Sequence, residues 1–243
     1  VKYGFVNVGS QKWTAWLHDA VRRAAANRLM VDIHDEYRPT GYSRTYPNLM
    51  TQEGIAGDET RPVNEQTLTL LFTRCIAGAA DNTICYNAGW VEQNATRAYQ
   101  LAKAVCFYSP WQFLYWYDRP SGSPGKGAVV AESPELEFYD RCPTVWDETR
   151  VIHGRIGGYA VIARRSGKEW FVGAMNSGKP RIFDVPLDFL GNGIEYAAGI
   201  YSDEPASVTR TRVRTDRQSV SRETVLKLEA SAKGGVAAWI APK

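Results

Sequence analysis

The stretch from Leu29 to Glu59, LMVDIHDEYRPTGYSRTYPNLMTQEGIAGDE, decides how this sequence is interpreted. It opens with a mostly apolar run that is typical of a buried strand and that ends at His34. A long polar loop follows, interrupted by proline and glycine, with carboxylates at both of its ends. A buried strand that leads into a long loop rich in acids is how an α/β barrel builds an active site. The stretch therefore predicts a functional site at the end of a strand.

The sequence before this stretch predicts a βαβ unit. Residues Lys2 to Val8 alternate between apolar and polar side chains, as a strand does, and Gln11 to Asn27 has the apolar spacing of a helix. Together with the strand from Leu29 to Ile33, they give a strand, a helix and a strand joined by short connections. This order implies a parallel sheet.

Two more helices are predicted after the long loop. One lies near Asn64 to Ala77, and the other runs from Asn94 to Phe107 with Asn94 as its N-cap. The aromatic run from Trp111 to Tyr117, WQFLYWY, fits either a strand or a turn of buried helix, because its periodicity does not separate the two.

The last third of the chain has a different pattern, with short alternating runs separated by turn residues. The predicted strands are Tyr159 to Arg164, Trp170 to Ala174, Ile182 to Val185, Tyr196 to Tyr201, Val208 to Arg214, Thr224 to Leu228 and Val236 to Ile240. Such spacing is typical of an antiparallel β-sandwich. We therefore expect an α/β portion over residues 1–130 and a small all-β domain over residues 145–243.

The α/β portion predicts only part of a (β/α)8 barrel. A closed barrel takes roughly 200 residues or more, and Val1 already lies inside an apolar run without an initiator Met. We expect a processed or partial chain that carries the C-terminal part of such a barrel, followed by the antiparallel β-sandwich.

Composition excludes several classes of partner. The net charge of +3 over 243 residues is too small to predict binding to nucleic acid or to an anionic membrane. No apolar run approaches the roughly 20 residues that a membrane span needs. The cysteines show no CxxC spacing and are predicted to be buried reduced thiols, at positions Cys75, Cys85, Cys106 and Cys142.

The central stretch contains four carboxylates that indicate a catalytic or metal-binding site, namely Asp35, Glu36, Glu53 and Glu59. A pair of carboxyl groups suits the hydrolysis of a glycosidic bond, because one protonates the leaving oxygen while the other stays ionised. Three or more acids also suit a hard cation such as calcium, which takes 6–8 oxygen ligands. The two uses are compatible, and the alternative is a solvated acidic loop.

The neighbours of these acids decide whether they can meet. Glu53 and Glu59 would point about 120° apart on one helix, but Gly54 and Gly57 favour a loop in which both can converge. His34, directly after the strand, is either a buried histidine or a ligand for a substrate hydroxyl. Arg44, within the loop, either contacts a sugar or stabilises the conformation of the loop.

The segment HDEYRPTGYSRTYPNLMTQEGIAGDE resembles the hallmark of glycoside hydrolase family 97, the bacterial calcium-dependent α-glucosidases and α-galactosidases. The likeness continues through FTRCIAGAADNT, SPWQFLYW and PTVWDETRVIHGRIGGYAVIARRSGKEWFVGAMN. Members of the family have an N-terminal β-sandwich, a central (β/α)8 barrel and a C-terminal β domain. The resemblance implies that this chain is the second half of the barrel together with the C-terminal domain.

The resemblance also implies roles for single residues. The general acid of the family falls on Glu59, and calcium ligands fall on Glu53, Glu59 and Asp35. In inverting members, the position of Asp35 is also the general base, a role that Glu36 could exchange with it. The nucleophilic Asp of retaining members falls near Asn7, which is not a carboxylate and cannot attack as one, so the sequence favours Asp35 as the base.

Further implications concern partners and location. Asp81, in AGAADNT, matches a stretch of the family near the mouth of the barrel, where it either contacts substrate or forms a turn. The expected partners are an oligosaccharide or glycoside and the N-terminal part of the barrel, which another chain could supply. A bacterial periplasmic or secreted protein is implied, although the chain contains no signal peptide. The alternative to an enzyme is a non-catalytic carbohydrate-binding or scaffold fragment.

Overall fold

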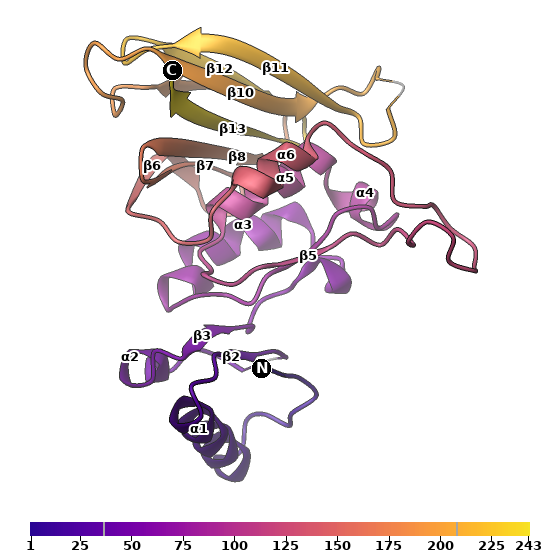
Figure 1. Cartoon of the computed structure of the whole chain (residues 1–243), viewed down its shortest axis with the longest axis vertical. Coiled ribbons are helices and arrows are strands. Elements are labelled where there is room, and N and C mark those ends of the chain that lie inside the picture. The colour runs from indigo at the N-terminus through magenta and orange to yellow at the C-terminus, as the bar shows by residue number, and fades with distance from the viewer. Residues whose placement is uncertain (36, 208) are drawn as a thin grey trace.

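The computed structural model describes residues 1–35, 37–207 and 209–243. Figure 1 shows the N-terminal helix and parallel strands at one end of the molecule and two antiparallel sheets at the other, with helices between them. No helix within these described ranges is long and apolar enough to span a membrane. Parallel strand pairs all precede residue 116, and the antiparallel ladders all follow residue 147.

The N-terminal layer confirms the predicted βαβ unit, but its first strand ends at Tyr3 instead of Val8. Strands β1 (Lys2–Tyr3), β2 (Val31–Ile33) and β3 (Leu49–Gln52) pair in parallel in this order, and α1 (Gln11–Ala26) connects the first two. Ser10 caps α1, because its side chain accepts a hydrogen bond from the backbone N–H of Trp13. The buried face of α1 packs with β2 and β3 in one apolar cluster.

Two further parallel strands continue this layer. Strands β4 (Thr83–Cys85) and β5 (Phe113–Tyr115) pair in parallel, which assigns the ambiguous aromatic run to a strand. A parallel bridge between Gln52 and Ala80 joins β3 to the residues before β4. The layer is curved, because the ammonium of Lys2 on β1 lies 3.9 Å from the ring centre of Phe113 on β5.

The helices after the loop differ from the prediction in several details. The helix predicted near Asn64 to Ala77 ends at Phe72, two short helices (residues 91–94 and 136–141) were not predicted, and the N-cap of the second predicted helix is different. The short helices α2 (Tyr42–Thr45) and η1 (Asp58–Thr60) lie in the loop itself, and they are followed by α3 (Asn64–Phe72), η2 (Arg74–Ile76), α4 (Val91–Asn94), α5 (Arg97–Cys106) and α6 (Leu136–Arg141). Asn94 as N-cap of α5 is wrong. Extended backbone at Ala95 ends α4 at Asn94, and Thr96 caps α5 by accepting from the N–H of Tyr99 at 3.1 Å.

The C-terminal portion consists of a six-stranded and a two-stranded antiparallel sheet. The larger sheet has the order β11 (Val213–Val220), β10 (Tyr196–Asp203), β13 (Gly235–Pro242), β8 (Glu169–Asn176), β7 (Tyr159–Ser166), β6 (Glu148–Arg155). The smaller sheet pairs β9 (Arg181–Pro186) with β12 (Val225–Ala230). A single apolar cluster joins the two sheets.

Two errors in the predicted strands of the C-terminal portion fall on the edges of the large sheet. Strand β6 was not predicted, and β11 begins at Val213 instead of residue 208, which lies outside the described residues. Edge strands leave much of their length in solvent, and most side chains of β6 and β11 are partly or fully exposed. The alternation of buried apolar residues that reveals a strand in sequence is therefore weak there.

Helix α5 packs directly on the face of the large sheet that is opposite the small one. A Cβ at Gly173 on β8 would lie 2.6 Å from the carbonyl oxygen of Ala102 on α5, so only glycine allows this approach. Near the same contact, the thiol of Cys106 donates to the carbonyl of Gly173 at 3.3 Å. The parallel and antiparallel portions thus share a packed interface.

Candidate active site

The structure brings three residues of the central stretch together. His34 follows β2, Glu53 follows β3, and Glu59 lies in η1. One ligand atom of each residue lies within 4.8 Å of the others. Parallel strands end at the same edge of a sheet, and side chains that follow neighbouring strands therefore meet there. The expectation that Glu53 and Glu59 converge is met by their geometry.

His34 links the carboxylates of this group. Its Nδ1 lies 2.5 Å from Oδ2 of Asp81 and 3.4 Å from Oε2 of Glu53, and its Nε2 lies 3.7 Å from Oε1 of Glu59. The hydrogen bond to Asp81 is the main cause that raises the pKa of His34, and the charge of Glu53 adds to it while burial opposes it. The imidazolium form is therefore stabilised between the acids.

Asp81 is connected to the site by its hydrogen bond to His34. Its side chain is fully buried, and besides His34 it binds the ammonium of Lys2 at 3.0 Å. Lys2 also lies 3.3 Å from the buried carboxylate of Asp32. These contacts make Asp81 a support for the orientation of His34, and contact of Asp81 with a substrate remains a prediction.

Burial changes the protonation of the acids in this layer. It is the main cause that raises the pKa of Glu53 to about 7, with smaller contributions from the charges of Asp81, Glu59 and Asp35, whereas His34 acts in the opposite direction. Since the folded pKa of Glu53 is above its ordinary value, its ionised form is disfavoured below about pH 7. A cation at this place would restore the ionised form.

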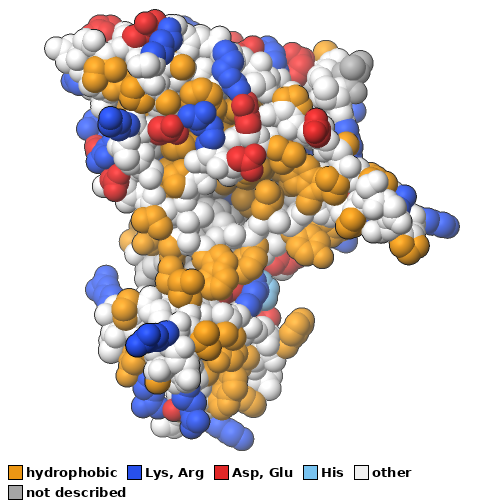
Figure 2. All heavy atoms as spheres, in the orientation of Figure 1, with side chains coloured by type: hydrophobic (Ala, Val, Ile, Leu, Met, Phe, Trp, Pro, Cys, Tyr) orange, Lys and Arg blue, Asp and Glu red, His pale blue; other side chains and the backbone are white. Residues whose placement is uncertain are grey.

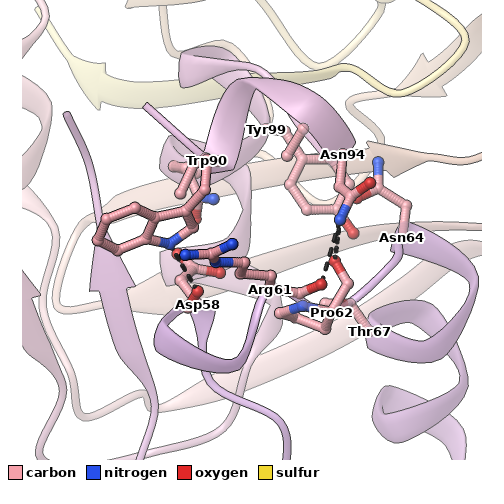
Figure 3. Close-up of a pocket in the computed structure, with 11 residues that line it drawn as sticks. Asp58, Arg61, Pro62, Asn64, Thr67, Trp90, Asn94 and Tyr99 are labelled. Atoms are coloured by element: carbon pink, nitrogen blue, oxygen red, sulfur yellow. Dashed lines mark hydrogen bonds between the residues drawn. The ribbon is translucent and has the colours of Figure 1, made fainter. Parts of the chain in front are cut away.

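The turn that carries Glu59 is anchored by residues distant in sequence. The carboxylate of Asp58 accepts from the ammonium of Lys103 at 2.7 Å and from the N–H of Cys85 at 3.0 Å. Figure 3 shows the indole of Trp90 directed at the carbonyl of Asp58, at 3.1 Å, and Asn94 directed at the carbonyls that follow the turn. These contacts fix the position of the Glu59 backbone.

Sequence reasoning missed Asp58 and Lys103. The only signal was a lysine in the apolar helix LAKAVC, at a position where helical spacing faces the core. A fully buried lysine needs a carboxylate partner, but the sequence does not say which one.

The other predicted residues lie at different distances from the group. Asp35 has left-handed backbone (φ 65°), and its Oδ2 accepts from the N–H of Val6 at 3.2 Å. Besides burial, the charge of Asp35 contributes to the raised pKa of Glu53, but Asp35 is not one of the three residues that meet within 4.8 Å. Arg44 on α2 is exposed, and no side-chain partner for it is found in the described part of the chain. Glu36 lies outside the described residues.

The described residues fit part of a calcium site. The carboxylates of Glu53 and Glu59 are oxygen donors of the kind that calcium prefers. Oε2 of Glu59 is buried and has no hydrogen-bond partner among the described residues, which leaves it available to a cation. The nitrogen of His34, which was not predicted as a ligand, suits calcium poorly, because this ion selects oxygen.

Gly57 controls the position of the Glu59 carboxylate. A Cβ at residue 57 would lie 2.4 Å from Oε2 of Glu59, while the extended backbone there (φ −69°, ψ 168°) accepts alanine. We expect Gly57→Ala to displace the carboxylate and to lower kcat of the complete protein by roughly tenfold to hundredfold, with little change in melting temperature. Gly89→Ala is the control, because its Cβ would meet nothing within 4 Å. Unchanged kcat for Gly57→Ala would contradict a positional requirement at Glu59.

Two family models match the chain. The family described as Glycosyl-hydrolase 97 C-terminal, oligomerisation, matches residues 145–241, and Glycoside hydrolase 97 matches residues 1–55. The matches together cover more than half of the chain. The chain therefore belongs to glycoside hydrolase family 97.

Two curated proteins are similar to almost the whole chain. A retaining alpha-galactosidase of Bacteroides thetaiotaomicron is 30% identical over 260 residues, which span 97% of this chain and 37% of that protein. A probable retaining alpha-galactosidase of Streptomyces bingchenggensis is 32% identical over 240 residues, spanning 98% of this chain and 35% of that protein. The chain thus spans little more than a third of the length of these relatives.

Solved structures agree with this assignment. A glycoside hydrolase family 97 enzyme from Pseudoalteromonas sp. strain K8, determined in complex with acarbose, superposes with a TM-score of 0.79 at 26% identity. The match covers 95% of this chain and 37% of that one. A beta-arabinopyranosidase gives a TM-score of 0.74 at 24% identity, over 98% of this chain and 38% of that one, and shares the fold.

Proposed function

We propose that this chain is part of a glycoside hydrolase that cleaves α-linked glucosides or galactosides. The observation that carries the proposal is the convergence of Glu53 and Glu59 around His34 at the ends of parallel strands, in a chain of family 97. The five parallel strands would then belong to a (β/α)8 barrel, completed by further sequence of the same or another protein chain, with the antiparallel sheets as a C-terminal β-sandwich.

Each side chain of the site has a separate proposed role in the reaction. Glu59 donates a proton to the glycosidic oxygen, and Asp35 or Glu36 removes a proton from water on the other side of the sugar ring. Asp81 holds Nδ1 of His34 at 2.5 Å, so that Nε2 faces the space beside Glu59 and can contact a substrate hydroxyl. Arg44 is a second candidate for a sugar contact.

Calcium is the metal that we propose for this site, held by Glu53 and Glu59, with Asp35 as a third ligand. When bound, it supplies positive charge that stabilises the ionised form of Glu53, whose pKa burial otherwise raises to about 7. The proposal further includes a periplasmic or secreted location in a bacterium.

The stereochemical route follows from the residues near β1. Both curated relatives are named as retaining enzymes, whereas this chain has Asn7 near the place where retaining members carry their nucleophile. Asn cannot form the covalent intermediate of that route, so we propose that Asp35 acts as a base and that the configuration is inverted. NMR of the first-formed sugar distinguishes the two outcomes.

The complete protein that contains this sequence tests the function and the metal together. We expect release of p-nitrophenol from the α-glucoside or the α-galactoside, loss of this activity with a chelator, and its return with calcium. Activity that resists the chelator would remove calcium from the proposal. Sugar binding without turnover of either substrate would favour a non-catalytic carbohydrate-binding or scaffold protein.

A further inference from the structure

Three aromatic side chains gather after the last two parallel strands. The rings of Trp90 and Tyr117 meet edge to face with centroids 4.7 Å apart, and those of Tyr115 and Tyr117 lie 4.6 Å apart. Tyr115 and Tyr117 are 59% and 41% exposed. We call these three residues the aromatic wall. Figure 2 shows hydrophobic side chains between the N-terminal layer and the protruding loop.

Tyr115 of the wall lies on the inner, concave side of the parallel layer. Phe113 and Tyr115 lie on the same face of β5, because side chains alternate along a strand. The ring of Phe113 contacts Lys2 of β1 across the curved layer, which defines the inner face. Leu114 therefore points to the outer face. Tyr115 ends β5, at the edge of the sheet where His34 and Glu53 follow β2 and β3.

Glu59, a member of the group around His34, is also close to the wall. Trp90 donates to the carbonyl of Asp58, the residue before Glu59, at 3.1 Å. The backbone N–H of Cys85 donates to the carboxylate of Asp58 at 3.0 Å. Burial is the main cause that raises the pKa of Tyr117 to about 12, and the side chain of Cys85 and the charge of Glu59 contribute to the rise. The wall is thus adjacent to the proposed acid.

One residue of the wall, Tyr117, is held in an unfavourable backbone conformation. Tyr117 has left-handed backbone (φ 67°), as has Arg61 (φ 57°), whose guanidinium lies 5.3 Å from the ring of Trp90. Arg210 of the C-terminal portion fixes Asp118, the residue after Tyr117, through two hydrogen bonds of 2.6 and 2.7 Å. Strained backbone persists where its surroundings impose it, and it is concentrated at binding sites.

We propose that the aromatic wall binds the leaving-group sugar of the substrate, a pyranose ring whose apolar face stacks on Tyr115 and Tyr117. This inference rests on the proposed function. A general acid stands beside the oxygen of the leaving group, so the leaving group is expected to lie on the surface next to Glu59. Aromatic rings with a polar tip offer a sugar both an apolar surface and a hydrogen bond.

The test measures two substrates of the complete protein. Both contain the sugar, glucose or galactose, that the wild type releases. One is an α-linked disaccharide, and the other is the α-glycosyl fluoride, whose leaving group has no ring. We expect Tyr117→Ala and Tyr115→Ala to lower kcat/KM for the disaccharide roughly tenfold relative to that for the fluoride. The loss should come from a higher KM for the disaccharide, because displacement of Glu59 would instead lower kcat. Tyr117→Phe retains the ring and is expected to restore most of the ratio. Leu114→Ala, on the outer face of the same strand, is the control and leaves the ratio unchanged.

The outcomes are distinguishable. An equal loss for both substrates, or no loss for either, would contradict a leaving-group site at the wall. The proposed hydrolase activity would not be affected by that result. A lower melting temperature with an unchanged ratio would show that protein, and not sugar, covers the wall, and it would overturn the proposal as well. A wild-type protein that hydrolyses neither substrate would instead refute the proposed function.

Discussion

Glu59→Gln is expected to lower kcat of the complete protein on a disaccharide by about 10²–10⁴-fold, the usual contribution of a general acid. Glutamine has nearly the same shape as glutamate but cannot donate an acidic proton. It also keeps a carbonyl oxygen near Nε2 of His34, which lies 3.7 Å from Oε1 of Glu59. The packing of the turn should therefore survive the change.

The leaving group separates acid catalysis from loss of a metal ligand. A p-nitrophenyl glycoside needs little protonation, because its leaving group is already a weak base. At saturating calcium, we expect Glu59→Gln to affect this substrate much less than the disaccharide. Glu229→Gln, at an exposed position of β12, is the matched control. Equal losses on both substrates would assign Glu59 to metal binding instead of proton transfer, and a wild-type rate would remove it from both roles.

Lys103→Met is expected to lower the free energy of unfolding by about 3–5 kcal/mol, the usual effect of removing one partner of a buried ion pair. Lys103 is fully buried, and its ammonium lies 2.7 Å from the carboxylate of Asp58, which is itself buried. Methionine fills a similar volume, but it leaves the charge of Asp58 with the N–H of Cys85 as its remaining partner in the described part of the chain.

Urea unfolding measures this change, and Lys227→Met provides the matched control. Lys227 also forms an ion pair, with Asp184 at 2.9 Å, but both side chains are mostly exposed, so a much smaller effect is expected. The double variant Lys103→Met with Asp58→Asn should recover part of the loss, because no buried charge remains. A loss below about 1 kcal/mol for Lys103→Met would show that this pair does not hold the turn.

The two substitutions act on one structural unit. Asp58 and Glu59 are consecutive in η1. The side chain of Asp58 is directed into the core, where it binds Lys103, and the side chain of Glu59 faces the site. A residue buried at this point determines where its neighbour can lie. We therefore attribute the position of the proposed acid to helix α5, which carries Lys103 and packs on the antiparallel sheet.

Local signals predicted much of the fold. The helical spacing of α1 and the apolar run of β2 indicated a βαβ unit, because each element buries its own face with a period that is visible in the sequence. Strands at the centre of the large sheet were found for the same reason. Edge strands β6 and β11 were misjudged, since a strand exposed to solvent has no buried alternation to reveal it.

The sequence by itself determined that acids and a histidine follow buried strands in this chain, and its motifs indicated the family. Only the tertiary structure decided that His34, in preference to Asp35, meets Glu53 and Glu59. It also decided that Asp81 binds His34 from 47 residues away and that Lys103 binds Asp58 from 45 residues away. The physical reason is that such contacts depend on how the parallel layer curves and on where α5 packs. Neither is encoded in the spacing of residues along one segment.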